Sequence, residues 1–191
     1  IIFKSKESIP EQYLHIYLVI TDRDKPIARA ALYFNPDLKY QQLNAACIGS
    51  VESTNDTSAF EFLISQAASI AKENGFSYLI GPMSGSTWES YRFNFENHFP
   101  LFLTEQLQQE YYNDLMVQTG FETISEYFSS FTYDVDFRFP EFEAINRYFL
   151  GLGAQVSPIF PGHYLDELNA LHEFLSEAFQ RNFLYTPISK E

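Results

Sequence analysis

The sequence has little cysteine and no long hydrophobic run. Cys47 is the one cysteine among 191 residues, so no disulfide forms within the chain, and a reducing cytoplasm is the expected compartment. It lies in the apolar run 45–48 and is predicted to be a core residue, not a nucleophile. No apolar stretch approaches the roughly 20 residues that span a bilayer. No secretory signal is visible, and the first residue, Ile1, suggests a processed or trimmed chain.

Basic residues are also scarce. The chain has 12 Lys and Arg against 25 Asp and Glu, a formal net charge of −13. Phosphate backbones are bound by clustered basic residues, so neither nucleic acid nor an anionic membrane is an expected partner. The four histidines have no metal-ligand spacing, and no metal site is predicted. Neither a Gly-rich phosphate loop nor a Gly-x-Ser-x-Gly motif is present.

Apolar and aromatic residues are abundant. Hydrophobic residues make up 46% of the chain, and there are 20 Phe and 13 Tyr. This composition predicts a folded domain with a large core. A Phe-rich core is favoured, with a groove lined by rings as the alternative.

The amino-terminal pattern predicts a hairpin and a third strand. Residues 13–20 and 27–34 are rich in β-branched and aromatic residues, and the polar run 21–26 separates them. Residues 45–51 form another such run.

A crossover unit follows. The polar run 52–58 is rich in residues that cap helices. A helix is then predicted from the spacing of Phe60, Leu63, Ile64, Ala67, Ala68 and Ala71. Residues 72–75 end this helix, and the short apolar run 76–80 predicts a buried strand. A strand, a helix and a strand of these lengths predict a parallel pair joined by a crossover.

Residues 81–93 read GPMSGSTWESYRF. The Gly-Pro pair ends the buried strand, and Ser86 with Glu89 is a capping box that predicts a short helix from Thr87. This helix would place four residues on one face: Trp88, Tyr91, Arg92 and Phe95. Two interpretations stay open. The face packs as an aromatic cluster, or it faces a ligand, because open α/β sheets bind ligands at the carboxyl ends of parallel strands.

The remaining pattern is less regular. Residues 99–103 and 121–135 have strand character, and residues 111–119 predict a helix stopped by Gly120. A domain boundary is expected at residues 137–140. Beyond it, a helix, a strand and a helix are predicted at residues 141–150, 154–160 and 165–179.

The order of these elements, together with the helix and Gly-Phe exit of residues 112–122, resembles the GNAT superfamily of acyl-CoA-dependent N-acyltransferases. With GPMSGSTWESYRF and residues 127–130, the chain resembles one subgroup of GNAT-like proteins. The resemblance implies an α/β fold in residues 1–135, a mixed twisted sheet with helices on both faces. Residues 136–191 would be a small α/β appendage that resembles the start of a second GNAT-like domain.

The resemblance also implies a cofactor site for acetyl-CoA. The family binds the CoA pyrophosphate on backbone amides where the central strand runs into the next helix. The residues that it assigns here are Val51, Ser53, Asn55, Thr57, Ser58 and Ala59. The family signature is Gln or Arg followed by Gly-x-Gly or Gly-x-Ala. Asn55, Ser58 and Phe60 stand at those positions, which predicts a degenerate CoA loop.

A catalytic base and a substrate surface follow from the same resemblance. Glu52, at the end of the central strand, is the candidate general base. Met116 stands where the family often has a tyrosine that acts as general acid. Tyr111 and Tyr112 are nearby but do not occupy that position. The candidate substrate-binding residues are Trp88, Tyr91 and Arg92.

Three functions are therefore expected as alternatives. The first is a GNAT-like domain with a degenerate acyl-CoA site that acts as a binding or scaffold domain. The second is an active acetyl-CoA-dependent N-acetyltransferase with Glu52 as base. The third is a structural or oligomerising module. The expected partners are a small amine or peptide, a second GNAT-like domain, or a second copy of the chain.

Overall fold

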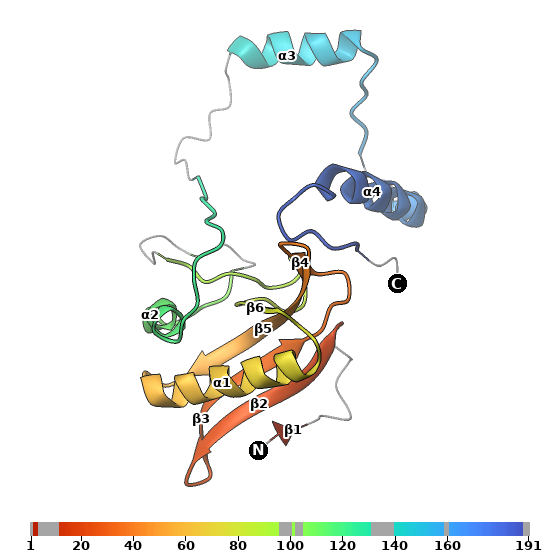
Figure 1. The fold of residues 1–191 in the computed structure, drawn as a ribbon. Coiled ribbons are helices and arrows are strands. Elements are labelled where there is room, and N and C mark those ends of the chain that lie inside the picture. The colour runs from red at the N-terminus through yellow and green to blue at the C-terminus, as the bar shows by residue number, and fades with distance from the viewer. Residues whose placement is uncertain are drawn as a thin grey trace. The chain divides into compact units, whose positions relative to one another are not determined.

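The computed structural model describes residues 2–3, 12–95, 101, 105–130, 140–158 and 161–188 (Figure 1). The chain divides into two compact units. The first comprises Ile1–Glu122 together with Leu175–Glu191, and the second comprises Thr123–Phe174.

The first unit is built on a mixed sheet. Its strands are β1 (Ile2–Phe3), β2 (Leu14–Asp22), β3 (Lys25–Tyr33), β4 (Lys39–Tyr40), β5 (Leu43–Ser53) and β6 (Tyr78–Ile80). The order is β1-β2-β3-β5-β4, with antiparallel neighbours, and β6 pairs with β5 in parallel. The predicted hairpin and third strand are confirmed. The hairpin turn is tighter than expected, because Asp22 pairs with Lys25 and only two residues, Arg23 and Asp24, turn the chain.

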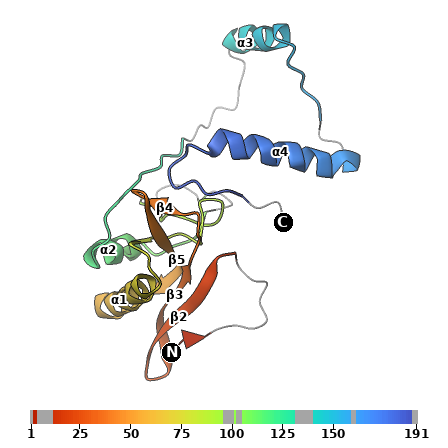
Figure 2. The same ribbon diagram turned by 45° about the vertical axis from the view of Figure 1, so that its right-hand side comes forward.

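Helix α1 (Thr57–Glu73) connects β5 to β6, which confirms the predicted crossover. It lies along one face of the β2–β3–β5 part of the sheet (Figure 2). It ends at the Asn74 cap, where the predicted stop lies.

The first core lies between this face and two helices. It contains residues of β2, β3, β5 and α1, and also Tyr112, Leu115 and Met116 from α2 (Tyr111–Gln118). Phe60 lies fully buried in it. The helix predicted at residues 111–119 is confirmed, and α2 covers the same face as α1.

The second core lies on the opposite face of the sheet. Its buried members are Ala31, Tyr33, Leu38, Ala45, Cys47, Ile80 and Met83, and partly buried tyrosines and Leu184 pack around them. None of these residues belongs to a helix. The expectation of helices on both faces is therefore wrong for the described part of this unit, because strands, loops and Leu184 supply this second core.

Cys47 is fully buried in the second core. Burial raises the pKa of its thiol to about 12, because a thiolate there would lose its hydration. The thiol therefore stays protonated at neutral pH, as expected of a core residue and not of a nucleophile.

The second unit is helical where it is described. It contains α3 (Pro140–Gly151), a 3₁₀ turn (Pro161–His163) and most of α4 (Tyr164–Phe179). Both predicted helices are confirmed. No helix in the described parts of the chain has the length and apolarity to cross a membrane.

Two predicted strands are absent where the structure can be compared. Residues 121–130 and 154–158 have no regular secondary structure, so strand assignments there were wrong. A strand forms only where a neighbouring strand accepts and donates its backbone hydrogen bonds. The apolar composition that predicted a strand is not buried here either, since Val156 is 98% exposed. Residues 131–135, 137–139 and 159–160, and all of 99–103 except Leu101, lie outside the described residues.

Candidate functional site

The end of β5 carries the candidate base. Ser50 has a φ of 49°, and the pairing of β5 with β3 shifts by one residue there. Beyond this bulge Glu52 pairs with Arg29: Arg29 Nε donates to Oε2 at 3.0 Å, and Nη2 lies 2.9 Å from Oε1. The Arg29 and Glu52 side chains are 58% and 61% exposed. An exposed pair stabilises a fold by about 1 kcal/mol at most, so Glu52 is accessible but already has a partner for both oxygens.

Ser53, a candidate cofactor residue, is held by α2. Tyr111 Oη donates to the Ser53 carbonyl at 2.8 Å, and the Ser53 N–H donates to Tyr112 Oη at 3.3 Å. Burial raises the pKa of Tyr112, and the bond from Ser53 opposes that shift. Val51, the other candidate on this strand, is buried in the first core. Both backbone groups of Ser53 are therefore occupied, and the Val51 side chain is turned into the core.

The start of α1 is the predicted phosphate site, and the chain fills it with its own carboxylate. Asp56 is the N-cap, and its Oδ1 accepts from the backbone N–H of Ser58 at 2.9 Å and of Ala59 at 3.1 Å. Thr57 Oγ1 donates to Gln118 Oε1 at 3.0 Å, and Asn55 is exposed. The backbone amides predicted to hold a pyrophosphate therefore already donate to the Asp56 carboxylate. The negative charge of this carboxylate would also repel a pyrophosphate.

Replacing Asp56 by alanine is expected to lower the free energy of unfolding by about 0.5–2 kcal/mol, because two helix-start amides lose their acceptor. Urea denaturation monitored by circular dichroism measures it. Asp56→Asn is the matched control, since asparagine caps equally well without the charge. Equal losses in both variants would mean that the charge of Asp56, and not its cap, matters.

Residues 81–95 form a loop where a helix was predicted. Met83 and Tyr91 make an antiparallel bridge, and the N–H of Ser84 donates to the Ser90 carbonyl. The capping-box prediction is wrong, because Ser86 Oγ accepts from the N–H of Trp88, two residues on, and closes a turn. The φ of 66° at Arg92 also excludes a helix there.

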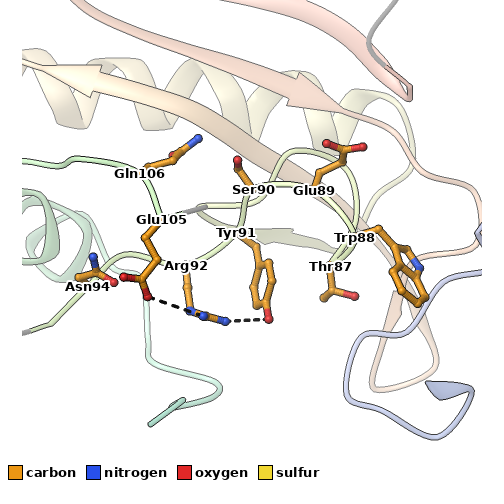
Figure 3. A pocket seen from close by; sticks show the side chains of 9 residues that line it. All are labelled: Thr87, Trp88, Glu89, Ser90, Tyr91, Arg92, Asn94, Glu105 and Gln106. Carbon is orange, nitrogen blue, oxygen red and sulfur yellow. Dashed lines mark hydrogen bonds and ion pairs between the residues drawn. The ribbon is translucent and has the colours of Figure 1, made fainter. Parts of the chain in front are cut away.

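This loop forms one side of a pocket of about 440 Å³ (Figure 3). Its lining residues are Thr87, Trp88, Glu89, Ser90, Tyr91, Arg92, Asn94, Glu105 and Gln106. All three candidate substrate-binding residues are therefore brought to one pocket. None of them lies in the β5–α1 junction where the candidate cofactor residues are found.

Arg92 is held between two pocket residues. Its Nη1 donates to Tyr91 Oη at 2.7 Å, and its Nη2 lies 4.0 Å from Glu105 Oε1. The guanidinium carbon also lies 4.7 Å from the centre of the Tyr91 ring. Figure 3 shows the guanidinium between the Glu105 carboxylate and the Tyr91 hydroxyl. This arrangement fixes a positive charge beside the half-buried Glu105, whose side chain is 18% exposed.

Trp88 contacts the carboxyl-terminal part of the same unit. Its Nε1 donates to the Thr186 carbonyl at 2.8 Å. Its ring makes edge contacts with Phe179 at 5.8 Å and Tyr185 at 6.2 Å between centroids. Trp88 therefore packs against aromatic residues and also lines the pocket, so both interpretations of this residue have support.

The pocket also contains residues that the sequence pattern did not indicate. Glu105 and Gln106 belong to no predicted motif. The neighbouring Gln108 fixes the Asn94 backbone, accepting from its N–H at 2.8 Å and donating to its carbonyl at 2.7 Å. These contacts span 14 residues of sequence and depend on the fold, so no local pattern would have found them.

Known proteins give no further guide. Nothing matches the chain among protein-family models, curated proteins or solved structures. The likeness to the GNAT superfamily therefore remains a prediction from the sequence. Among the described residues, no three His, Cys, Asp or Glu side chains gather in a way that would hold a metal ion.

Proposed function

We propose that the first unit is a GNAT-like binding domain whose acyl-CoA site is closed by its own residues and whose ligand site is the pocket around Arg92. The ligand is a small amine or a peptide that carries one. The single observation that carries this proposal is the pocket itself, which joins two carboxylates, two aromatic rings and a fixed guanidinium.

The chemistry of the pocket favours a cation. Glu89 and Glu105 bring two negative charges against the one positive charge of Arg92. The chain as a whole has a formal net charge of −13, which attracts cations from a distance. The rings of Trp88 and Tyr91 offer faces on which an ammonium group is stabilised. An amine would be held by charge-assisted hydrogen bonds from its N–H groups to carboxylate oxygens.

The closed cofactor site supports a binding role over a catalytic one. The Asp56 carboxylate takes the amides of Ser58 and Ala59, and Tyr111 and Tyr112 take both backbone groups of Ser53. A CoA pyrophosphate would have to displace a carboxylate that is already well placed. Calorimetric titration of acetyl-CoA into the full chain is expected to show no binding at millimolar ligand.

The pocket proposal predicts that Glu105→Gln weakens cation binding. The probe is a tetrapeptide with one lysine and a blocked amino terminus, titrated calorimetrically. We expect the affinity to fall about tenfold or more, because a charged acceptor is worth roughly 1.5–3 kcal/mol. The same peptide with its lysine acetylated is expected to bind as weakly to the unsubstituted chain.

Glu61→Gln is the matched control for this substitution. Glu61 is exposed on α1 and does not line the pocket, so this variant removes the same charge from the protein. Equal weakening by both substitutions would mean that overall charge, and not the pocket, attracts the peptide. Absence of binding to the unsubstituted chain would overturn the amine assignment.

An active N-acetyltransferase is the second candidate, and one observation favours it. Glu52 lies at the end of β5 next to two phenols, those of Tyr111 and Tyr112, which are anchored on the adjacent Ser53. Glu52 and Arg29 both influence the pKa of Tyr112 electrostatically. A base and an acid near one strand end are what acetyl transfer to an amine requires. Micromolar binding of acetyl-CoA in the titration above would favour this candidate.

A further inference from the structure

The residues after α4 lie on the sheet as a bound peptide would. Residues 182–188, called here the C-terminal segment, belong to the first unit although residues 123–174 form another unit between them and α2. Phe183 contacts Tyr40 edge-on at 6.1 Å between ring centroids, and Leu184 packs against the second core. The surface that receives the segment comprises Tyr40, Trp88 and the exposed edge of the second core.

Consecutive residues of the segment each contact this surface. Leu184 enters the apolar core, Tyr185 packs against Trp88, and the Thr186 carbonyl accepts the indole N–H at 2.8 Å. The N–H of Tyr185 donates to the Asn182 carbonyl at 3.1 Å, so the segment docks as a turn. Docked peptides are held by the same kinds of contact, apolar side chains in pockets and hydrogen bonds to the peptide backbone. Tryptophan suits such a surface, since it combines a large apolar face with one donor.

Two features of the segment depend on its being docked. Leu184 has a φ of 55°, a left-handed conformation that is unfavourable for leucine and that its packing must offset. Thr186 is fully buried, and its Oγ1 has no hydrogen-bond partner among the described residues. Both features lower the affinity of the docked state, as is expected of a contact that is made and released.

From these contacts we propose that the surface around Trp88 is a docking site for a peptide, and that the chain's own residues 182–188 are its reversible occupant. Because the segment is part of the same chain, an effective concentration and not a bimolecular affinity sets how often it occupies the surface. A peptide of the same sequence added in solution competes for the same surface. This inference does not depend on the ligand of the pocket.

The chain has a single tryptophan, so all tryptophan emission comes from Trp88 and reports on docking when no pocket ligand is added. In the full chain, Leu184→Asp is expected to release the segment, shift the Trp88 emission to the red and make it accessible to a quencher. The matched control is Leu165→Asp on α4, which is 72% exposed and belongs to the other unit. It is expected to leave the emission unchanged.

A synthetic peptide of residues 179–188, FQRNFLYTPI, tests whether the segment is separable. Added to the Leu184→Asp chain, it is expected to restore the blue-shifted emission, and a peptide with the same Leu184→Asp change is not. Its apparent affinity for the unsubstituted chain should be at least about tenfold lower, because the resident segment competes. A Thr186→Val peptide should bind about fivefold more tightly or better, since it buries no unpaired hydroxyl.

Two results would overturn the proposal. One is unchanged Trp88 emission in a folded Leu184→Asp chain, which would show that the segment does not cover the indole. The other is a shifted emission that no peptide restores, which would show that the segment is an inseparable part of the fold. If Leu184→Asp fails to fold by circular dichroism, Tyr185→Ala takes its place, because it removes a partly buried ring that contacts Trp88 and one hydrogen bond, from the Tyr185 hydroxyl to the Ser176 carbonyl.

Discussion

Replacing Phe60 by alanine is expected to lower the free energy of unfolding by about 3–5 kcal/mol, as large-to-small changes in a packed core do. Phe60 is completely buried, and it packs in the first core with residues of the sheet and of α2. The loss combines the removed apolar surface with the cavity left behind. Urea denaturation with an unchanged m value measures it directly.

Phe62→Ala is the control for this experiment. Phe62 lies two residues further along α1 and is 53% exposed, so its loss should change the stability by no more than about 0.5 kcal/mol. Similar losses in the two variants would contradict the burial of Phe60. The Phe60→Ala chain also tests the closed cofactor site. It places a small residue where the resemblance to the GNAT superfamily predicts one, yet we expect no acetyl-CoA binding while the Asp56 carboxylate accepts from the amides of Ser58 and Ala59.

Replacing Gly49 by alanine is expected to destabilise the fold by about 1–3 kcal/mol or more, because it forces atoms into filled space. A Cβ on Gly49 would lie 2.7 Å from the Met83 carbonyl oxygen and 2.8 Å from both the Met83 carbonyl carbon and Ser84 Oγ. Backbone atoms cannot rotate away as a side chain can. The loop that begins at Met83 and forms one side of the pocket would therefore have to move.

Two measurements follow for Gly49→Ala. Thermal unfolding should show a lower melting temperature, and titration with the lysine peptide should show weaker binding if the loop shifts. Gly151→Ala, at the end of α3, is the control, because no described atom beyond its chain neighbours and its own helix backbone lies within 4 Å of the new methyl group. A Gly49→Ala chain as stable as the control would mean that β5 and the loop are further apart than described.

The sequence predicted best the elements whose signals are local. The hairpin, α1 and α4 each have a strong period and a clear end, and α1 has Asp56 as a recognisable cap. The parallel pairing of β5 and β6 followed from the lengths of the strand, helix and strand in the crossover. The signals that predict each of these elements lie within the element or directly beside it in the sequence.

The failures arose where the outcome depended on distant residues. The Ser86–Glu89 capping box was present in the sequence, but backbone bonds from Ser84 to Ser90 and the bridge at Met83 held the chain as a loop. Glu52 was chosen as a candidate base without any sign that Arg29 would face it across the sheet. Trp88 was grouped with Tyr91 and Arg92, which line the same pocket, but its bond to Thr186 joins residues 98 positions apart. No periodicity in the sequence contains this information.

The bulge at Ser50 changes which face of the sheet the following residues of β5 occupy. Before it, Cys47 belongs to the second core and Ile48 to the first; after it, Val51 belongs to the first. Odd-numbered positions thus change face within one strand, because one residue of β5 has no counterpart in β3. In evolutionary terms the strand resembles one that has absorbed a single-residue insertion. An unbroken alternation would have turned Val51 to the opposite face and Glu52 into the apolar core.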